Sequence, residues 1–199
     1  MRGTMKCLGL VAVMLLTGVL TDFARAQGDA MKMDAPKKGV RAEALMDLAQ
    51  LEKKFEDLAS AVPAEKYSWR PGDGVRSVGE VFAHITGANY MFMGFLGAKP
   101  AMKMDPGMEK TATSKDDVVK NLAPSFEFVR TTISGLSDND LEKTTKMFGY
   151  TVSYRMVIMT ELGHLHEHLG QSIAYARTNQ VVPPWTAAAE AASAKKDAK

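Results

Sequence analysis

The amino-acid sequence predicts an all-α protein, specifically a four-helix bundle. Apolar residues recur at spacings of three and four along four long segments, which is the period of an amphipathic helix. Stretches rich in glycine and proline separate these segments. No segment shows the apolar–polar alternation of a β-strand over any length. Four helices of this length, joined by loops, are typical of a bundle.

The first two helices are bounded by clear local signals. The first ends before Pro63, and the loop at 67–76 that follows contains Pro71, Gly72 and Gly74. The second begins with a capping box, Ser77-Val78-Gly79-Glu80, and closes near Gly97. The apolar face of the first helix consists of Leu45, Leu48, Leu51, Phe55, Leu58 and Val62.

The other two helices complete the predicted bundle. The third begins at Ser114, with Asp116 and Asp117 in a first turn that suits the helix dipole. The fourth runs from about Val152 to Thr178. The bundle domain then covers residues 40–185. Residues 186–199 are mostly Ala, Lys, Glu and Asp with nothing to bury, and we expect a disordered tail.

The N-terminus has the layout of a secretory signal peptide over residues 1–26. Two basic residues precede a 14-residue apolar run, and the segment ends Ala24-Arg25-Ala26, a cleavage signature. The run is too short to span a bilayer comfortably. A buried N-terminal helix is the alternative, but nothing polar interrupts one face of the run. We therefore expect export to the periplasm or the medium, with residues 27–39 as a flexible lead-in.

The composition of the mature chain restricts its partners. Cleavage after Ala26 leaves 173 residues, enough for one compact domain, and lowers the formal net charge from +2 to 0. A neutral chain argues against nucleic acid or an anionic membrane as a partner. Cleavage also removes Cys7, the only cysteine, so the mature chain has neither a disulfide nor thiol chemistry of its own.

Three of the four histidines lie in one stretch of the fourth helix. His164 and His168 are about 40° apart on the helix surface, whereas His166 points about 160–200° away from them. The pair could grip one metal ion, and His84 on the second helix is the only remaining histidine that could complete the site. Spacing alone leaves two alternatives open, namely solvated histidines and core histidines.

Two sets of motifs resemble the DinB-like (DinB/YfiT) family. The first is Trp69-Arg70-Pro71 followed by Val75-Arg76-Ser77-Val78-Gly79-Glu80-Val81-Phe82-Ala83-His84-Ile85, and the second is His164-x-x-x-His168-x-Gly170-Gln171 with Tyr175 and Val182-Pro183-Pro184. The resemblance spans about 40–185. It implies a four-helix bundle, often a homodimer, with a metal held by three histidines that map onto His84, His164 and His168. Leu165 and Leu169 depart from the pattern of many relatives, but both lie off the metal stripe, the face of the fourth helix that carries His164 and His168.

Three histidine ligands leave a coordination position open, as catalytic rather than structural zinc does. The expected function is therefore a metal-dependent enzyme, a hydrolase or a thiol-type group transferase, acting on an unidentified small molecule. The family that the chain resembles includes thiol-dependent transferases and isomerases, which is why the resemblance implies thiol-type group transfer as one possible reaction. Zn²⁺ is the first choice of metal, with Ni²⁺, Fe²⁺ or Mn²⁺ as alternatives. Glu161 shares the metal stripe and is either a general base or a structural carboxylate.

Two rival functions remain. Ala30-Met31-Lys32-Met33-Asp34 reappears as Ala101-Met102-Lys103-Met104-Asp105, with Met108 close behind. Thioethers favour Cu(I), so the repeat suggests a non-catalytic protein that binds metal or buffers copper. The other rival is a purely structural bundle whose histidines bind nothing.

Overall fold

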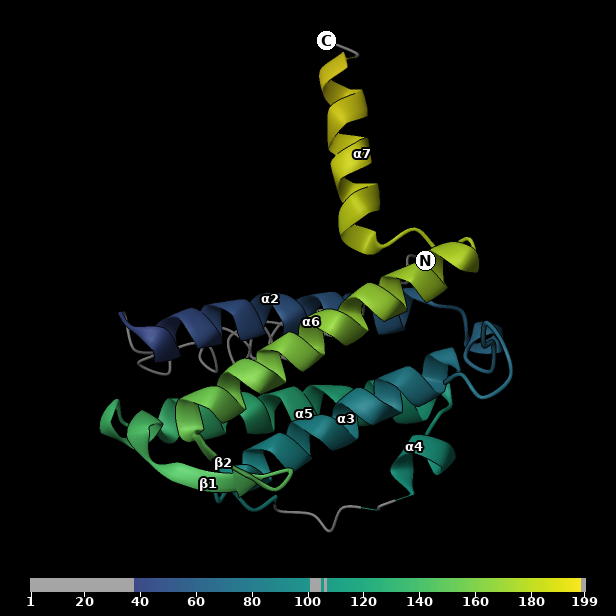
Figure 1. Cartoon of the computed structure of the whole chain (residues 1–199). Helices are drawn as coiled ribbons and strands as arrows, with labels where there is room; N and C mark the ends of the chain where they lie inside the picture. Colours follow the sequence, from purple (N-terminus) through teal and green to yellow (C-terminus); the bar gives the residue numbers. More distant parts are fainter. Residues whose placement is uncertain (1–37, 101–104, 106, 198–199) are drawn as a thin grey trace, which may run out of the picture. The chain divides into compact units, whose positions relative to one another are not determined.

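The computed structural model describes residues 38–100, 105 and 107–197, and within them the predicted all-α bundle is confirmed (Figure 1). Four long helices form it, and each contacts two others, so that they enclose one core. These helices are α2 (Val40–Ala61), α3 (Val78–Phe95), α5 (Lys115–Gly135) and α6 (Tyr154–Thr178). The predicted signal peptide and nearly all of the predicted lead-in lie outside the described residues.

The core forms where the apolar faces of the four helices meet. The Phe55 ring packs edge-on against Phe82, with centroids 6.4 Å apart, and contacts Phe126 at 5.7 Å. All three rings are essentially inaccessible to solvent. Burying side chains of this size supplies the main driving force for folding, at about 25 cal/mol per Å² of apolar surface. None of the helices in the described part of the chain is long and apolar enough to cross a bilayer.

Helix α3 begins at the predicted capping box. The Ser77 hydroxyl accepts a hydrogen bond from the backbone N–H of Glu80 at 3.2 Å, and the Glu80 carboxylate accepts one from the N–H of Ser77 at 2.7 Å. Both groups satisfy donors that a helix start leaves free. The cap therefore fixes the register of the helix that carries His84.

The loop regions contain short elements. Between α3 and α5 lies the one-turn helix α4 (Met108–Thr111), and two 3₁₀ turns, η1 (Ala64–Lys66) and η2 (Asn139–Glu142), follow α2 and α5. Strands β1 (Thr144–Met147) and β2 (Tyr150–Ser153) form an antiparallel hairpin before α6, with Met147 opposite Tyr150. Its two turn residues, Phe148 and Gly149, both have positive φ, at 49° and 88°. Strands of four residues are too short for an alternation pattern, so the sequence did not indicate them.

The C-terminal tail differs from the prediction. Residues 184–197 form a helix, α7 (Pro184–Asp197), where we expected disorder over 186–199. Pro184 takes the first helical position, which suits its fixed φ, and the alanines that follow have the highest helix propensity. Trp185 packs against the core, and the Lys54 ammonium lies 5.8 Å from its ring centroid. The helix is exposed from 187 to 195, so its propensity rather than burial explains that part.

Candidate metal centre

The structure brings His84, His164 and His168 together into one cluster. Each can offer a ring nitrogen, and the three nitrogens lie within 4.8 Å of one another. Nε2 of His84 is 3.1 Å from Nε2 of His164, and the His168 ring centroid lies 4.8 and 4.5 Å from those of His84 and His164. The first two rings are partly exposed and the third is buried. The cluster therefore lies at the wall of the bundle, within reach of solvent.

Helical geometry explains this arrangement. His164 and His168 are one turn apart on α6, and α6 packs against α3, which carries His84. His166 faces elsewhere: it is exposed, and its Nε2 lies 2.9 Å from the Asp47 carboxylate of α2. The sequence-based separation of His166 from the other three histidines agrees with these positions.

A carboxylate holds the His84 ring from outside the cluster. Nδ1 of His84 lies 3.0 Å from Oε2 of Glu109, on α4. Arg76 binds the same carboxylate through two nitrogens, at 2.7 and 3.2 Å, and chiefly because of this contact the pKa of Glu109 lies below its usual range. An ionised Glu109 accepts a hydrogen bond from the Nδ1–H of His84. This tautomer has its lone pair on Nε2, which faces the other rings.

An amide holds His168 in the same way. Its Nδ1 lies 2.7 Å from Oε1 of Gln171, whose amide nitrogen donates to the Tyr175 hydroxyl at 3.0 Å. The Trp69 ring packs edge-on against Tyr175, with centroids 5.3 Å apart. Because an amide oxygen can only accept, His168 donates from Nδ1 and its Nε2 is free to bind a ligand. Gln171 and Tyr175 thus act through His168.

Glu161 lies behind His164. Its carboxylate is wholly buried, and its Oε2 is 4.0 Å from Nδ1 of His164. Oriented to suit its neighbours, the Asn89 amide donates to the other oxygen, Oε1, at 2.7 Å. Among the described residues neither Oε2 nor Nδ1 has a hydrogen-bond partner. Glu161 therefore faces the Nδ1 edge of His164, a position suited to orienting that ring, and its role as a general base stays a prediction.

The donor set fits a metal ion. Nε2 of His84 lies 3.1 Å from Nε2 of His164. Because His84 carries its proton on Nδ1, beside Glu109, its Nε2 presents a lone pair to His164. A cation between the rings would let both Nε2 atoms offer lone pairs, and the proton of His164 would then lie on Nδ1, opposite the unpartnered Glu161 oxygen. Burial lowers the pKa of His84 and lowers that of His164 to about 4, so these two rings are neutral at pH 7, the form that binds metal.

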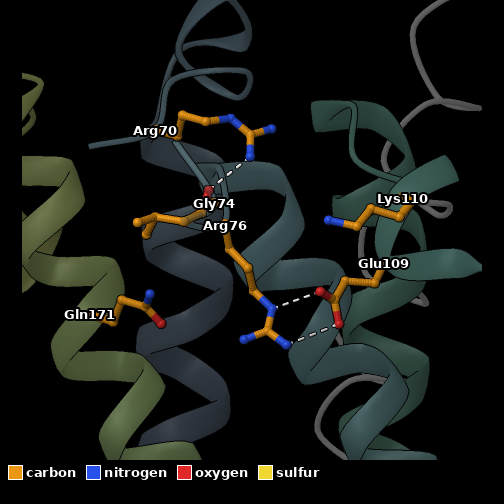
Figure 2. A pocket seen from close by; sticks show the side chains of 7 residues that line it. Arg70, Gly74, Arg76, Glu109, Lys110 and Gln171 are labelled. Carbon is orange, nitrogen blue, oxygen red and sulfur yellow. Dashed lines mark hydrogen bonds and ion pairs between the residues drawn. The ribbon is translucent and has the colours of Figure 1, made fainter. Parts of the chain in front are cut away.

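A pocket of about 450 Å³ adjoins the cluster (Figure 2). Glu109 and Gln171, the side chains that hold His84 and His168, form part of its wall. Three cations, Arg70, Arg76 and Lys110, line the rest of it together with the backbone near Gly74. Glu109 could not be predicted from the sequence, because it lies on a single helical turn within a loop rich in Met, Lys and Pro.

The methionine repeat remains a prediction. Met31, Met33, Met102 and Met104 lie outside the described residues. Met108 begins α4 and is partly exposed. The copper hypothesis therefore gains no support from the described part of the chain.

Several solved structures share the fold, and two of them are DinB-like proteins. A DinB-like protein from Bacillus cereus matches with a TM-score of 0.60 at 20% identity, over 71% of this chain and 93% of its own. The DinB-like protein YjoA from Bacillus subtilis matches with a TM-score of 0.57 at 18% identity, over 69% and 92%. A conserved protein from Enterococcus faecalis gives 0.57 at 13% identity, over 70% and 96%. At identities of 20% or less, these similarities show a shared fold.

Sequence comparison gives the family. The profile of the DinB superfamily matches residues 47–172, a span that contains all three clustered histidines. The chain therefore belongs to the DinB superfamily, as its motifs predicted. A search of curated proteins found no significant match.

The electrostatics of Glu161 predict how many protons are released when metal binds. Burial raises the pKa of Glu161 to about 8, so the carboxyl is largely protonated at pH 7 in the metal-free protein. A nearby cation favours the ionised form and lowers this pKa, whereas His84 and His164 are already neutral. At pH 7, Zn²⁺ binding should release up to about one proton from Glu161. Calorimetric titrations in buffers of different ionisation enthalpy measure this number.

The matched variant is Glu161→Gln, which keeps the shape of the side chain but has no proton to lose. We expect its Zn²⁺ binding to release clearly fewer protons than that of the parent. Equal proton release in the two proteins would show that the protons come from the histidines and that Glu161 does not respond to the ion.

Proposed function

We propose that this protein is an exported metal-dependent enzyme in which His84, His164 and His168 hold one divalent ion. The observation that carries the proposal is the convergence of three imidazoles from two helices, with Glu109 and Gln171 bonded to the outer nitrogens of two of them. Such outer contacts orient histidine ligands in metal sites and fix the tautomer that binds. A purely structural bundle, whose histidines bind nothing, would have no need of these outer contacts.

Zn²⁺ remains the first choice of metal, with Ni²⁺, Fe²⁺ or Mn²⁺ as alternatives. Three neutral nitrogen donors suit all four ions, and a site with only three protein ligands keeps a position for water or substrate. When bound, such an ion acts as a Lewis acid that lowers the pKa of water or polarises a substrate atom. Hydrolysis and thiol-type group transfer are the reaction classes that fit this chemistry.

The surrounding residues would serve the site by positioning. Glu109 and Gln171 turn the lone pairs of His84 and His168 towards the cluster. The ring of Phe92 packs against His164 with centroids 5.5 Å apart and would restrict the movement of that ring. With a metal bound, Glu161 would accept a hydrogen bond from the Nδ1–H of His164. The ligands are then fixed before substrate arrives, which lowers the cost of organising the site.

Export is proposed from the N-terminal segment alone. The basic start, the 14-residue apolar run and the Ala24-Arg25-Ala26 ending support it. The measurable consequence is a mature chain that begins at Gln27. A substrate met outside the cytoplasm would then be the natural target of the enzyme.

The function is tested on protein purified without added metal and without a metal-chelating tag. Elemental analysis should find close to one divalent ion per chain. The loaded protein should turn over members of a panel of esters, amides and thiol-acceptor pairs, and chelation should abolish that turnover. Stoichiometric metal without turnover would support the metal-binding or metal-buffering rival. Protein that takes up no ion even from added Zn²⁺ would contradict the proposal.

A further inference from the structure

The pocket in Figure 2 contains a concentration of positive charge beside the histidine cluster. Arg70 and Arg76 come from the loop that precedes α3, and Lys110 comes from α4 on the other side. Figure 2 shows the Lys110 side chain extending towards the side of the pocket on which Arg70 and Arg76 lie. Segments far apart in the sequence thus direct cations into one space of about 450 Å³.

A buried carboxylate holds two of these cations in place. Oε2 of Glu80 is 3.1 Å from Nη1 of Arg70, and Oε1 of Glu80 is 3.0 Å from Nζ of Lys110. The hydrogen bond from Ser77, followed by those from Lys110 and Arg70, lowers the pKa of Glu80 to about 2, so this carboxylate stays ionised. Arg70 also donates to the backbone oxygen of Val75 at 2.8 Å. The cation geometry therefore exists before any ligand arrives.

The charges at the pocket do not cancel. Among the described residues, Arg70, Arg76 and Lys110 pair with two carboxylates, those of Glu80 and Glu109, which leaves one positive charge in excess. Arg76 uses Nε and Nη2 on Glu109, and its Nη1 has no acceptor in the described part of the chain. One more anion would neutralise the site and receive charge-assisted hydrogen bonds, for which the planar guanidinium is well suited.

The pocket is also in contact with the candidate metal ligands through their partners. Glu109 connects its wall to His84, and Gln171 connects it to His168. A group bound among the three cations would therefore lie next to the outer contacts of two metal ligands. This distinguishes it from an ordinary surface cluster of lysine and arginine.

We propose that this pocket binds the oxyanion group, a carboxylate or a phosphate, of a small-molecule substrate. Arg70 and Lys110 supply the charge, Arg76 adds the free edge of its guanidinium, and the rest of the substrate extends towards the histidine cluster. The inference rests on the proposed function, since it names the class of substrate that the metal site would act on.

The test compares two double variants of the Zn²⁺-loaded protein. Arg70→Gln/Lys110→Gln removes two pocket charges, whereas Lys120→Gln/Lys146→Gln removes two exposed charges elsewhere and is the matched control. Inorganic phosphate and, separately, acetate are titrated against each protein while the arginine Nε–H NMR signals are followed. Because the cations are partly exposed, we expect the pocket variant to bind roughly fivefold to tenfold more weakly. The control should match the parent.

Three results would overturn the inference. The first is equal anion affinity in the parent and the pocket variant. The second is equal weakening in the control variant, which would mean that overall charge is responsible. The third is an affinity that is lost in His164→Ala but kept in the pocket variant, which would place the anion on the metal itself. The ratio of phosphate to acetate affinity then assigns the substrate group.

The two proposals fail in different ways. Metal content is measured on the same samples as anion binding. A chain that takes up no Zn²⁺ contradicts the proposed function, and with it the substrate that the inference assigns, whatever its phosphate affinity. A loaded chain whose anion affinity does not depend on Arg70 and Lys110 contradicts the anion pocket alone.

Discussion

Replacing His164 by alanine should abolish tight metal binding. His164 lies against both other rings, with its Nε2 3.1 Å from that of His84 and its centroid 4.5 Å from that of His168. The variant keeps only two imidazoles, and we expect its Zn²⁺ affinity to fall by at least about a hundredfold. The stabilisation that excess metal gives the native state should disappear with it, which at 100 times Kd is about 2.7 kcal/mol. Zn²⁺ titration and thermal melting with and without metal measure both effects.

His166→Ala is the matched control on the same helix. Its ring is exposed and faces Asp47, so its loss removes only a surface contact, with an effect of about 0–1 kcal/mol that does not depend on metal. His84→Ala and His168→Ala should behave like His164→Ala. If His166→Ala loses metal as the others do, the ion is bound elsewhere. If His84→Ala binds like the parent, α3 supplies no ligand.

Replacing Gly79 by alanine should strongly destabilise the protein and weaken the metal site. A Cβ at Gly79 would overlap the backbone carbonyl of Thr113, which lies in the segment that leads from α4 into α5. Backbone atoms cannot move aside as a side chain can, so either α3 or this segment must shift. Overpacking of this kind costs about 1–3 kcal/mol, and we expect the upper end of that range. In a chain of this length the melting temperature should fall by roughly 5–10 °C.

The shift should also reach the histidine cluster. Thr113 follows α4 closely, and α4 carries the Glu109 that holds His84, so Zn²⁺ affinity should decrease as well. Gly94→Ala, on the same helix, is the control because its added Cβ meets nothing within 4 Å. It should leave stability unchanged or raise it by up to about 1 kcal/mol through helix propensity. Equal melting of Gly79→Ala and the parent would show that the approach of Thr113 to α3 is not close.

The features that the sequence predicted depend on local pattern. The period of the apolar residues located all four helices, and the capping box located the start of α3. One helical turn separates His164 from His168, so their common direction followed from spacing alone. The third member of the cluster needed more, because no local rule pairs residues 84 and 164. Elimination left His84 as the candidate, and the family motifs supported that choice.

The features that were missed depend on contacts or on very short elements. Glu109 lies on a single turn, which has too few residues for a periodic pattern. Glu161 was named from the sequence as a site candidate, but its full burial behind His164 was not predicted, because a helical projection contains no information about depth. The tail helix α7 follows from the high helix propensity of alanine. The prediction of disorder rested on the lack of apolar residues and gave this propensity too little weight.

The clustered side chains come from only two helices, α3 and α6, and 80 positions separate His84 from His164 along the chain. All of α5 and the hairpin lie between them in sequence. A newly made chain therefore cannot assemble the complete cluster from any local segment, and an ion bound by all three rings requires the two helices to be docked already. Retention of an ion by all three rings would thus report that a molecule has reached its native topology.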